Sequence, residues 1–129
     1  MALNRAAVQT GIVAALPLVV PAAVANAWLA GRPDPNAALL VLAYLVLLLG
    51  FTFGGFAAAR VSDTGTPLLH GAAGATGAWA VLQAASIVIR LASGDGLRPA
   101  SIIFTGLLAA CAGVVGGILA ARAPKTARG

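Results

Sequence analysis

Two polar side chains inside otherwise apolar stretches are the first candidates for chemistry, His70 near the start of one stretch and Gln83 near its middle. Histidine titrates near neutral pH, so His70 could act as a switch or a proton relay. We favour a simpler role, in which the imidazole at a helix end bonds to a loop carbonyl. An unpaired amide is costly in a membrane, so we expect Gln83 to bond to a neighbouring helix or another subunit, in preference to lining a pore.

The apolar stretches contain no Asp, Glu, Lys or Arg in their central parts. Proton-coupled pumps and cation exporters usually bind the coupling ion with such a residue. General acid–base catalysis needs positioned titratable groups, and a single histidine cannot form a metal site alone. We therefore expect a protein that is not an enzyme, with no catalytic, cofactor-binding or metal-binding residues.

Pro17 and Pro21 lie one helical turn apart in the first apolar stretch. Each removes a backbone donor, which leaves the carbonyls of Val13 and Pro17 without their usual partners. Many transporters expose backbone to a substrate at broken helices, although proline kinks are also common in inert spans. Together with His70 and Gln83, the two prolines are the candidate polar or pore positions.

The elements that must position these residues are four apolar stretches, because 60% of the 129 residues are hydrophobic and only 9% are charged. A membrane-spanning helix needs about 20 mainly apolar residues. The stretches cover residues 8–30, 37–59, 68–89 and 100–121, followed by a basic tail at 122–129. The pattern predicts an all-α integral membrane four-helix bundle that forms one transmembrane domain over residues 1–129.

Prolines mark the starts of three of these helices. We expect Asp34 to cap the second helix with Pro35 at its first position, where the missing N–H costs nothing. Pro67 and Pro99 mark the starts of the third and fourth helices in the same way.

The net charge of +5 comes from residues in loops and at the termini, where they meet lipid headgroups. The basic balance thus indicates contact with the lipid bilayer and no nucleic acid. One side carries Arg5, Arg60, Arg122, Lys125 and Arg128, and the other carries Arg32, Arg90 and Arg98. Since positively charged loops stay in the cytoplasm, we expect both termini there, with dual insertion as an alternative.

The pattern GGxxAAR occurs at residues 54–60 and again at 116–122, 62 residues further on. The repeat favours two tandem helical hairpins of like orientation, related by an axis along the membrane normal.

Small residues are expected to hold the bundle together, because lipid tails are as apolar as leucine and close backbone contact must drive association. The predicted packing glycines are Gly50, Gly54, Gly55, Gly74, Gly77, Gly106, Gly113, Gly116 and Gly117. On each helix we expect the small residues to form one smooth face that meets the smooth faces of the other helices. These faces also include Ala25, Ala84, Ala85 and Ala121. Adjacent glycines free two faces of a helix, so we expect the pairs at 54–55 and 116–117 to lie at the bundle centre.

The segment GGFAAAR at 54–60, a short loop, and then Pro67-Leu68-Leu69-His70-Gly71 at the start of the next span resemble the YrzE-like family. These are small four-helix membrane proteins of Gram-positive bacteria. The resemblance covers about a fifth of the chain. It implies the fold and a bacterial plasma membrane, and it brings no activity with it.

Two functions are compatible with these observations. The favoured one is a small non-enzymatic bundle that acts through helix contacts, with itself or as an accessory subunit of a larger membrane complex. The alternative is a homo-oligomeric channel or transporter for a small solute or ion. A conduit needs its polar groups to converge on one continuous cavity, whereas an accessory protein distributes them among separate helix contacts.

Overall fold

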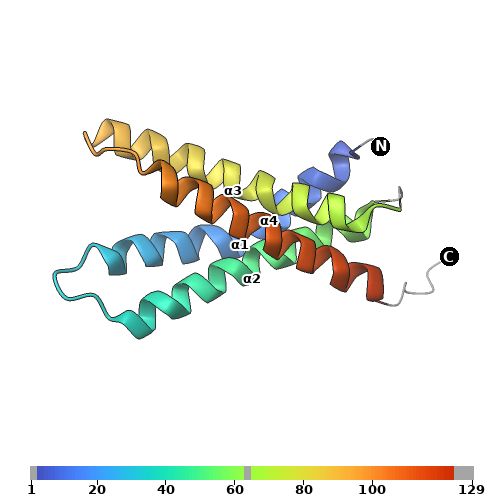
Figure 1. Ribbon diagram of the computed structural model, residues 1–129, viewed down its shortest axis with the longest axis horizontal. Coiled ribbons are helices and arrows are strands. Elements are labelled where there is room, and N and C mark those ends of the chain that lie inside the picture. Colours follow the sequence, from blue (N-terminus) through green and yellow to red (C-terminus); the bar gives the residue numbers. More distant parts are fainter. Residues whose placement is uncertain (1–2, 63–64, 124–129) are drawn as a thin grey trace.

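The computed structural model describes residues 3–62 and 65–123, which form four α-helices and no strand. They are α1 (Arg5–Ala30), α2 (Ala37–Val61), α3 (Pro67–Ala92) and α4 (Pro99–Arg122) (Figure 1). Each is long and apolar enough to cross a bilayer. The all-α four-helix fold predicted from the sequence is confirmed, and the chain is a small multi-pass membrane protein. Asp63, Lys125, Arg128 and most of the predicted basic tail lie outside the described residues.

Side chains and prolines define where the helices begin. The side chain of Asn4 accepts hydrogen bonds from the N–H groups of Ala6 and Ala7, at 3.0 and 3.3 Å, and so caps α1. Pro67 and Pro99 occupy the first turns of α3 and α4, where no backbone donor is needed.

The predicted cap of α2 is wrong. Asn36, and not Asp34, is the N-cap, and its side chain accepts from the N–H of Leu39 at 3.2 Å. Pro35 therefore precedes the helix. An asparagine three residues before a free amide caps as well as an aspartate does, so the residue nearer the apolar run takes the position.

Pro17 and Pro21 do not interrupt α1, which continues as one helix from Arg5 to Ala30. Both prolines are exposed on the outside of the bundle. The broken helix that would support transport is not observed in α1.

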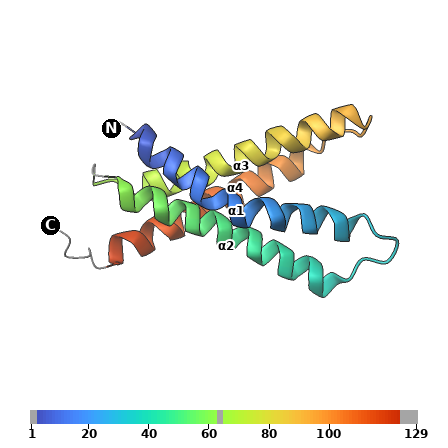
Figure 2. The same cartoon turned by 180° about the vertical axis from the view of Figure 1, so that it is seen from behind.

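The chain forms two helical hairpins, α1–α2 and α3–α4, that meet mainly at one end. Both termini lie at that end, and the loops 31–36 and 93–98 lie at the other, where the hairpins diverge (Figures 1 and 2). Helix α2 contacts all three other helices, while α1 and α4 do not contact each other.

The bundle therefore has two unlike halves. We name the half with the termini the closed half (residues 5–19, 50–61, 67–78 and 109–122) and the half with the two hairpin loops the open half (residues 20–49 and 79–108). Buried residues of α3 end at Ala78 and those of α4 begin at Ala109, so neither helix buries a residue in the open half. The α1–α2 hairpin keeps Ala22, Leu29 and Ala43 buried there.

Candidate functional site

The paired glycines of α2 face two different helices. A Cβ atom added at Gly54 would lie 2.7 Å from the Cβ of Ala15 in α1. One added at Gly55 would lie 2.6 Å from the carbonyl oxygen of Gly113 in α4. Real Cβ atoms essentially never come this close to a neighbour, so α2 approaches both helices at a distance that only glycine allows.

The paired glycines of α4 show the same division. A Cβ at Gly116 would lie 2.6 Å from the backbone nitrogen of Phe56 in α2, and one at Gly117 would lie 2.6 Å from the carbonyl oxygen of Pro67 in α3. Helices α2 and α4 are thus each packed between two neighbours at the centre of the closed half. In each copy of the GGxxAAR pattern one glycine faces the other helix of its own hairpin and one faces the other hairpin, but the order is reversed: Gly54 and Gly117 face their own hairpin partners.

Most of the other predicted glycines also lie at helix contacts, but their neighbours are side chains. A Cβ added at Gly74 would meet the side chain of Ala58, and one added at Gly50 would meet that of Val19. A Cβ added at Gly77 would meet Ile12, and one added at Gly106 would meet Trp79. Gly71 is absent from the predicted set, although it faces the backbone of Gly113 and Gly117. Its position three residues before Gly74, on the face of α3 that carries His70, is the sequence signal that could have found it.

Four alanines expected on the smooth faces lie outside the contacts. Ala25, Ala84, Ala85 and Ala121 are exposed. For Ala84 and Ala85 the reason is that α3 has diverged from the α1–α2 hairpin at this level. On α4, the neighbouring Ala120 is buried in place of Ala121.

His70 is fully buried and joins the start of α1 to the start of α3. Its Nε2 atom accepts a hydrogen bond of 2.9 Å from the backbone N–H of Asn4. Its Nδ1 atom lies 3.0 Å from the carbonyl oxygen of Thr66, which can only accept. The two contacts together require the neutral imidazole with its proton on Nδ1.

The His70 contact completes the cap of α1. In a capping box, a Glu or Gln at the third helical position bonds back to the N–H of the N-cap residue. Here that position holds Ala7, which has no such group, and the ring of His70 from another helix takes its place. The expected bond to a carbonyl at the helix start is present, and the bond to Asn4 was not anticipated.

Gln83 and Trp79 share one acceptor in the open half. The Nε2 atom of Gln83 and the Nε1 atom of Trp79 donate to Oγ1 of Thr105 in α4, at 3.4 and 3.2 Å. The hydroxyl of Thr105 in turn donates to the carbonyl oxygen of Ser101 at 2.9 Å. Gln83 thus links two helices, and Thr105, a hydroxyl within the fourth span, is the partner that sequence reasoning missed.

A third polar contact lies within the α1–α2 hairpin, where the side-chain amide of Asn26 donates to the carbonyl oxygen of Leu40 at 3.4 Å. Throughout the described residues, no buried side-chain nitrogen or oxygen lacks a hydrogen-bond partner. The same residues contain no group of three or more His, Cys, Asp or Glu that could hold a metal ion.

The four candidate pore positions do not come together. His70 lies in the closed half and bonds to α1, while Gln83 lies in the open half and bonds to α4. Pro17 and Pro21 are exposed on α1. These positions line no common cavity.

Comparison with known proteins adds no relative, because no family model, no curated protein and no solved structure matches the chain. The class of the protein therefore rests on its fold and contacts alone. It is a small membrane protein of four helices arranged as two hairpins.

Proposed function

We propose that the chain is a non-enzymatic accessory subunit that acts through helix contacts in a larger membrane complex. The observation that supports this most is the distribution of its polar side chains. They form three separate contacts, between α1 and α3, α1 and α2, and α3 and α4, so that each joins a different pair of helices. Such contacts hold helices together, whereas a conduit would gather polar groups along one path.

The open half of the α3–α4 hairpin is the surface proposed for the partner. Bulky apolar side chains there are largely exposed, among them Val88 at 66%, Ile103 at 63% and Phe104 at 60%. Lipid contact satisfies such side chains, but association in a bilayer depends on packing, and at this level α3 and α4 pack mainly on each other. A helix from a partner would find faces here on which α3 and α4 bury no residue, whereas both helices bury residues against their neighbours in the closed half.

The proposal includes a bacterial plasma membrane with both termini in the cytoplasm. Arg5, Arg60 and Arg122 lie at the end of the bundle with the termini, and Arg32, Arg90 and Arg98 lie near the hairpin loops. The sequence adds Lys125 and Arg128 to the first group, which gives it the excess that the positive-inside rule associates with the cytoplasm.

Photo-crosslinking from two phenylalanines tests the partner surface. Phe104 in the open half and Phe53 in the closed half are both well exposed, at 60% and 50%. Each is replaced in turn by benzoylphenylalanine in the full chain, followed by irradiation of native membranes. We expect a discrete protein adduct from position 104, which co-purifies in mild detergent, and only lipid adducts from position 53. Equal adducts from both positions, or none from 104, would contradict the proposal.

The substitution Gln83→Leu tests the alternative of a conduit. As an accessory subunit, the variant should lose stability by about 1 kcal/mol, in the range measured for hydrogen bonds between membrane helices. It should leave ion and solute flux into proteoliposomes at the level of the unmodified protein. Flux through the unmodified protein that the substitution abolishes would establish the conduit instead.

A further inference from the structure

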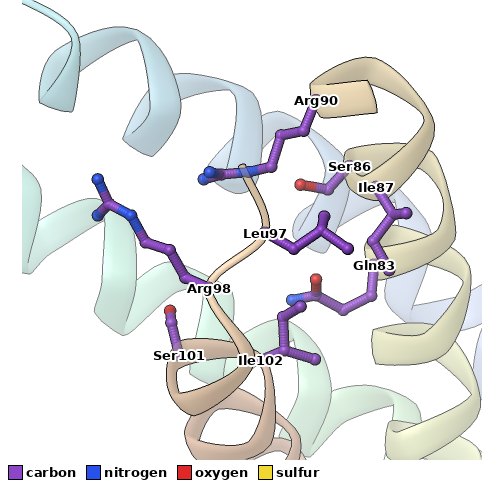
Figure 3. Close-up of a pocket in the computed structure, with 8 residues that line it drawn as sticks. All are labelled: Gln83, Ser86, Ile87, Arg90, Leu97, Arg98, Ser101 and Ile102. Carbon is purple, nitrogen blue, oxygen red and sulfur yellow. The ribbon is translucent and has the colours of Figure 1, made fainter. Parts of the chain in front are cut away.

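A small polar pocket lies between α3 and α4 beside the loop 93–98. Its volume is about 70 Å³, and polar side chains from both helices line it (Figure 3). These are Gln83, Ser86, Arg90, Arg98 and Ser101. Figure 3 shows the amide of Gln83 and the hydroxyl of Ser86 directed from α3 toward the loop. The side chain of Arg90 also reaches toward the loop, while that of Arg98 extends from the loop away from Gln83 and Ser86. Two arginines and three residues with neutral hydrogen-bonding groups therefore line one space.

The arginines of this pocket have no anionic partner in the described part of the chain. Neither Arg90 nor Arg98 forms an ion pair there, and no ring stacks on either guanidinium. Arg32, which lies in the other hairpin loop, differs because its guanidinium lies 4.6 Å from the ring centre of Trp28. An arginine presents several donors in a planar fork that suits phosphate and carboxylate oxygens. The guanidinium donors of both pocket arginines are therefore available to an anion.

The start of α4 adds a further positive contribution to the pocket. The N-cap residue Arg98 makes no side-chain capping bond, so the first amide groups of α4 have no side-chain acceptor. These amides carry the positive end of the helix dipole and favour an anion. Ser101, in the same first turn, contributes its side chain to the pocket wall.

The size of the pocket and its depth along α3 limit which ligands it could bind. One water needs about 10–15 Å³ of such space, so the pocket has room for a group of about five heavy atoms, as in a phosphate. Arg90 and Arg98 stand at helix ends, where lipid headgroups lie, and Gln83 lies about 10 Å deeper along α3 at 1.5 Å rise per residue. We propose that this pocket binds the phosphate group of an anion at the membrane surface, a chemistry shared by phospholipid headgroups and inorganic phosphate.

Native mass spectrometry of the full chain in mild detergent tests the site with two probes, phosphatidylglycerol and inorganic phosphate. The double variant Arg90→Gln/Arg98→Gln removes both guanidinium groups, and Arg32→Gln is the control for the loss of an arginine at the same end. The variant Ser86→Ala/Ser101→Ala removes two hydroxyls without a change of net charge. It therefore distinguishes a built site from general attraction to a basic surface.

We expect the double arginine variant to weaken binding of the probe by at least about tenfold, since charge-assisted hydrogen bonds are roughly twice as strong as neutral ones. The serine variant should weaken it about threefold, and Arg32→Gln less than twofold. This pattern with phosphatidylglycerol alone identifies a headgroup site, and with inorganic phosphate also a site for the free anion. Equal losses in all the arginine variants with no effect of the serines, or no binding of either probe, would overturn the proposal.

Discussion

The closed and open halves of the bundle are built from the same four helices but hold together differently. In the closed half, glycines bring backbones into contact, as between Gly71 and Gly113 and between Gly55 and Gly113. In the open half, each hairpin is joined by side chains, such as the donors that meet Thr105. Among the glycines of the four described helices, Gly106 alone lies in the open half.

The difference shows how composition along a span sets the separation of membrane helices. Burial from water cannot draw helices together in lipid, so their approach depends on how close the backbones can pack. Where the glycines of α3 and α4 become rare, beyond Gly77 and before Gly113, the hairpins diverge (Figure 2). The same feature that packs one half closely leaves apolar faces of the other half exposed.

The largest effect is expected from an added methyl group in the closed half. In Gly55→Ala, the new Cβ would meet backbone atoms of Gly113 at 2.6 and 2.7 Å, which cannot move without separating α2 from α4. We expect a loss of stability of about 3 kcal/mol, at the upper end of typical overpacking costs. The midpoint of unfolding by sodium dodecyl sulfate in mixed micelles, followed by circular dichroism, measures it.

Two other glycines serve as matched controls for this substitution. In Gly106→Ala, the three atoms nearest to the new Cβ would all belong to the ring of Trp79, the closest at 2.9 Å. This side chain can shift, so we expect a loss of about 1 kcal/mol. Gly96 has no neighbour within 4 Å of the added atom, and Gly96→Ala should change stability by less than about 0.5 kcal/mol. A loss in Gly106→Ala as large as in Gly55→Ala would remove the distinction between the two halves.

The next effect concerns the polar contact of the closed half. Replacement of His70 by Leu leaves the N–H of Asn4 without its acceptor, and we expect a loss of about 1–2 kcal/mol from this orphaned group. The start of α1 should also fray, which hydrogen exchange of the amides of residues 4–8 would detect as faster exchange.

Gln9→Leu is the control for the histidine substitution, since Gln9 is exposed on the same helix. It should leave both stability and exchange unchanged. If His70→Leu slows or does not alter exchange at the start of α1, the imidazole does not complete that cap and its role is packing alone.

Much of the fold follows from the sequence, because bilayer length and hydropathy define four spans and prolines mark where α3 and α4 begin. That Gly54 and Gly55 face two different helices also follows from the sequence, because adjacent residues lie on different faces of a helix. The acceptor role of His70 toward Asn4 could not be predicted, since 66 residues separate them and only the crossing of α1 and α3 brings them together.

The divergence of the hairpins was likewise beyond the sequence pattern. Small residues continue along α3 as Ala84 and Ala85, and by composition alone they are as suitable for packing as those of the closed half. They are exposed because α3 has no α1 or α2 neighbour at that level, which is a property of the crossing of two whole hairpins. The polar pocket depends on the same geometry, since Arg90 and Arg98 flank a loop whose course no periodicity specifies.

The smallest effect is expected at the loop of the α1–α2 hairpin in the open half. The residues compared there are Asn36, which caps α2, and Asp34, which the sequence predicted as its cap. Asn36→Ala removes the acceptor for the N–H of Leu39 and should cost about 0.5–1 kcal/mol, as for other exposed N-caps. Asp34→Ala should cost less than about 0.3 kcal/mol, because Asp34 precedes the cap and is exposed. The same denaturation midpoint measures both. The reverse order would show that α2 begins at Pro35, two residues before Ala37, with Asp34 as its cap.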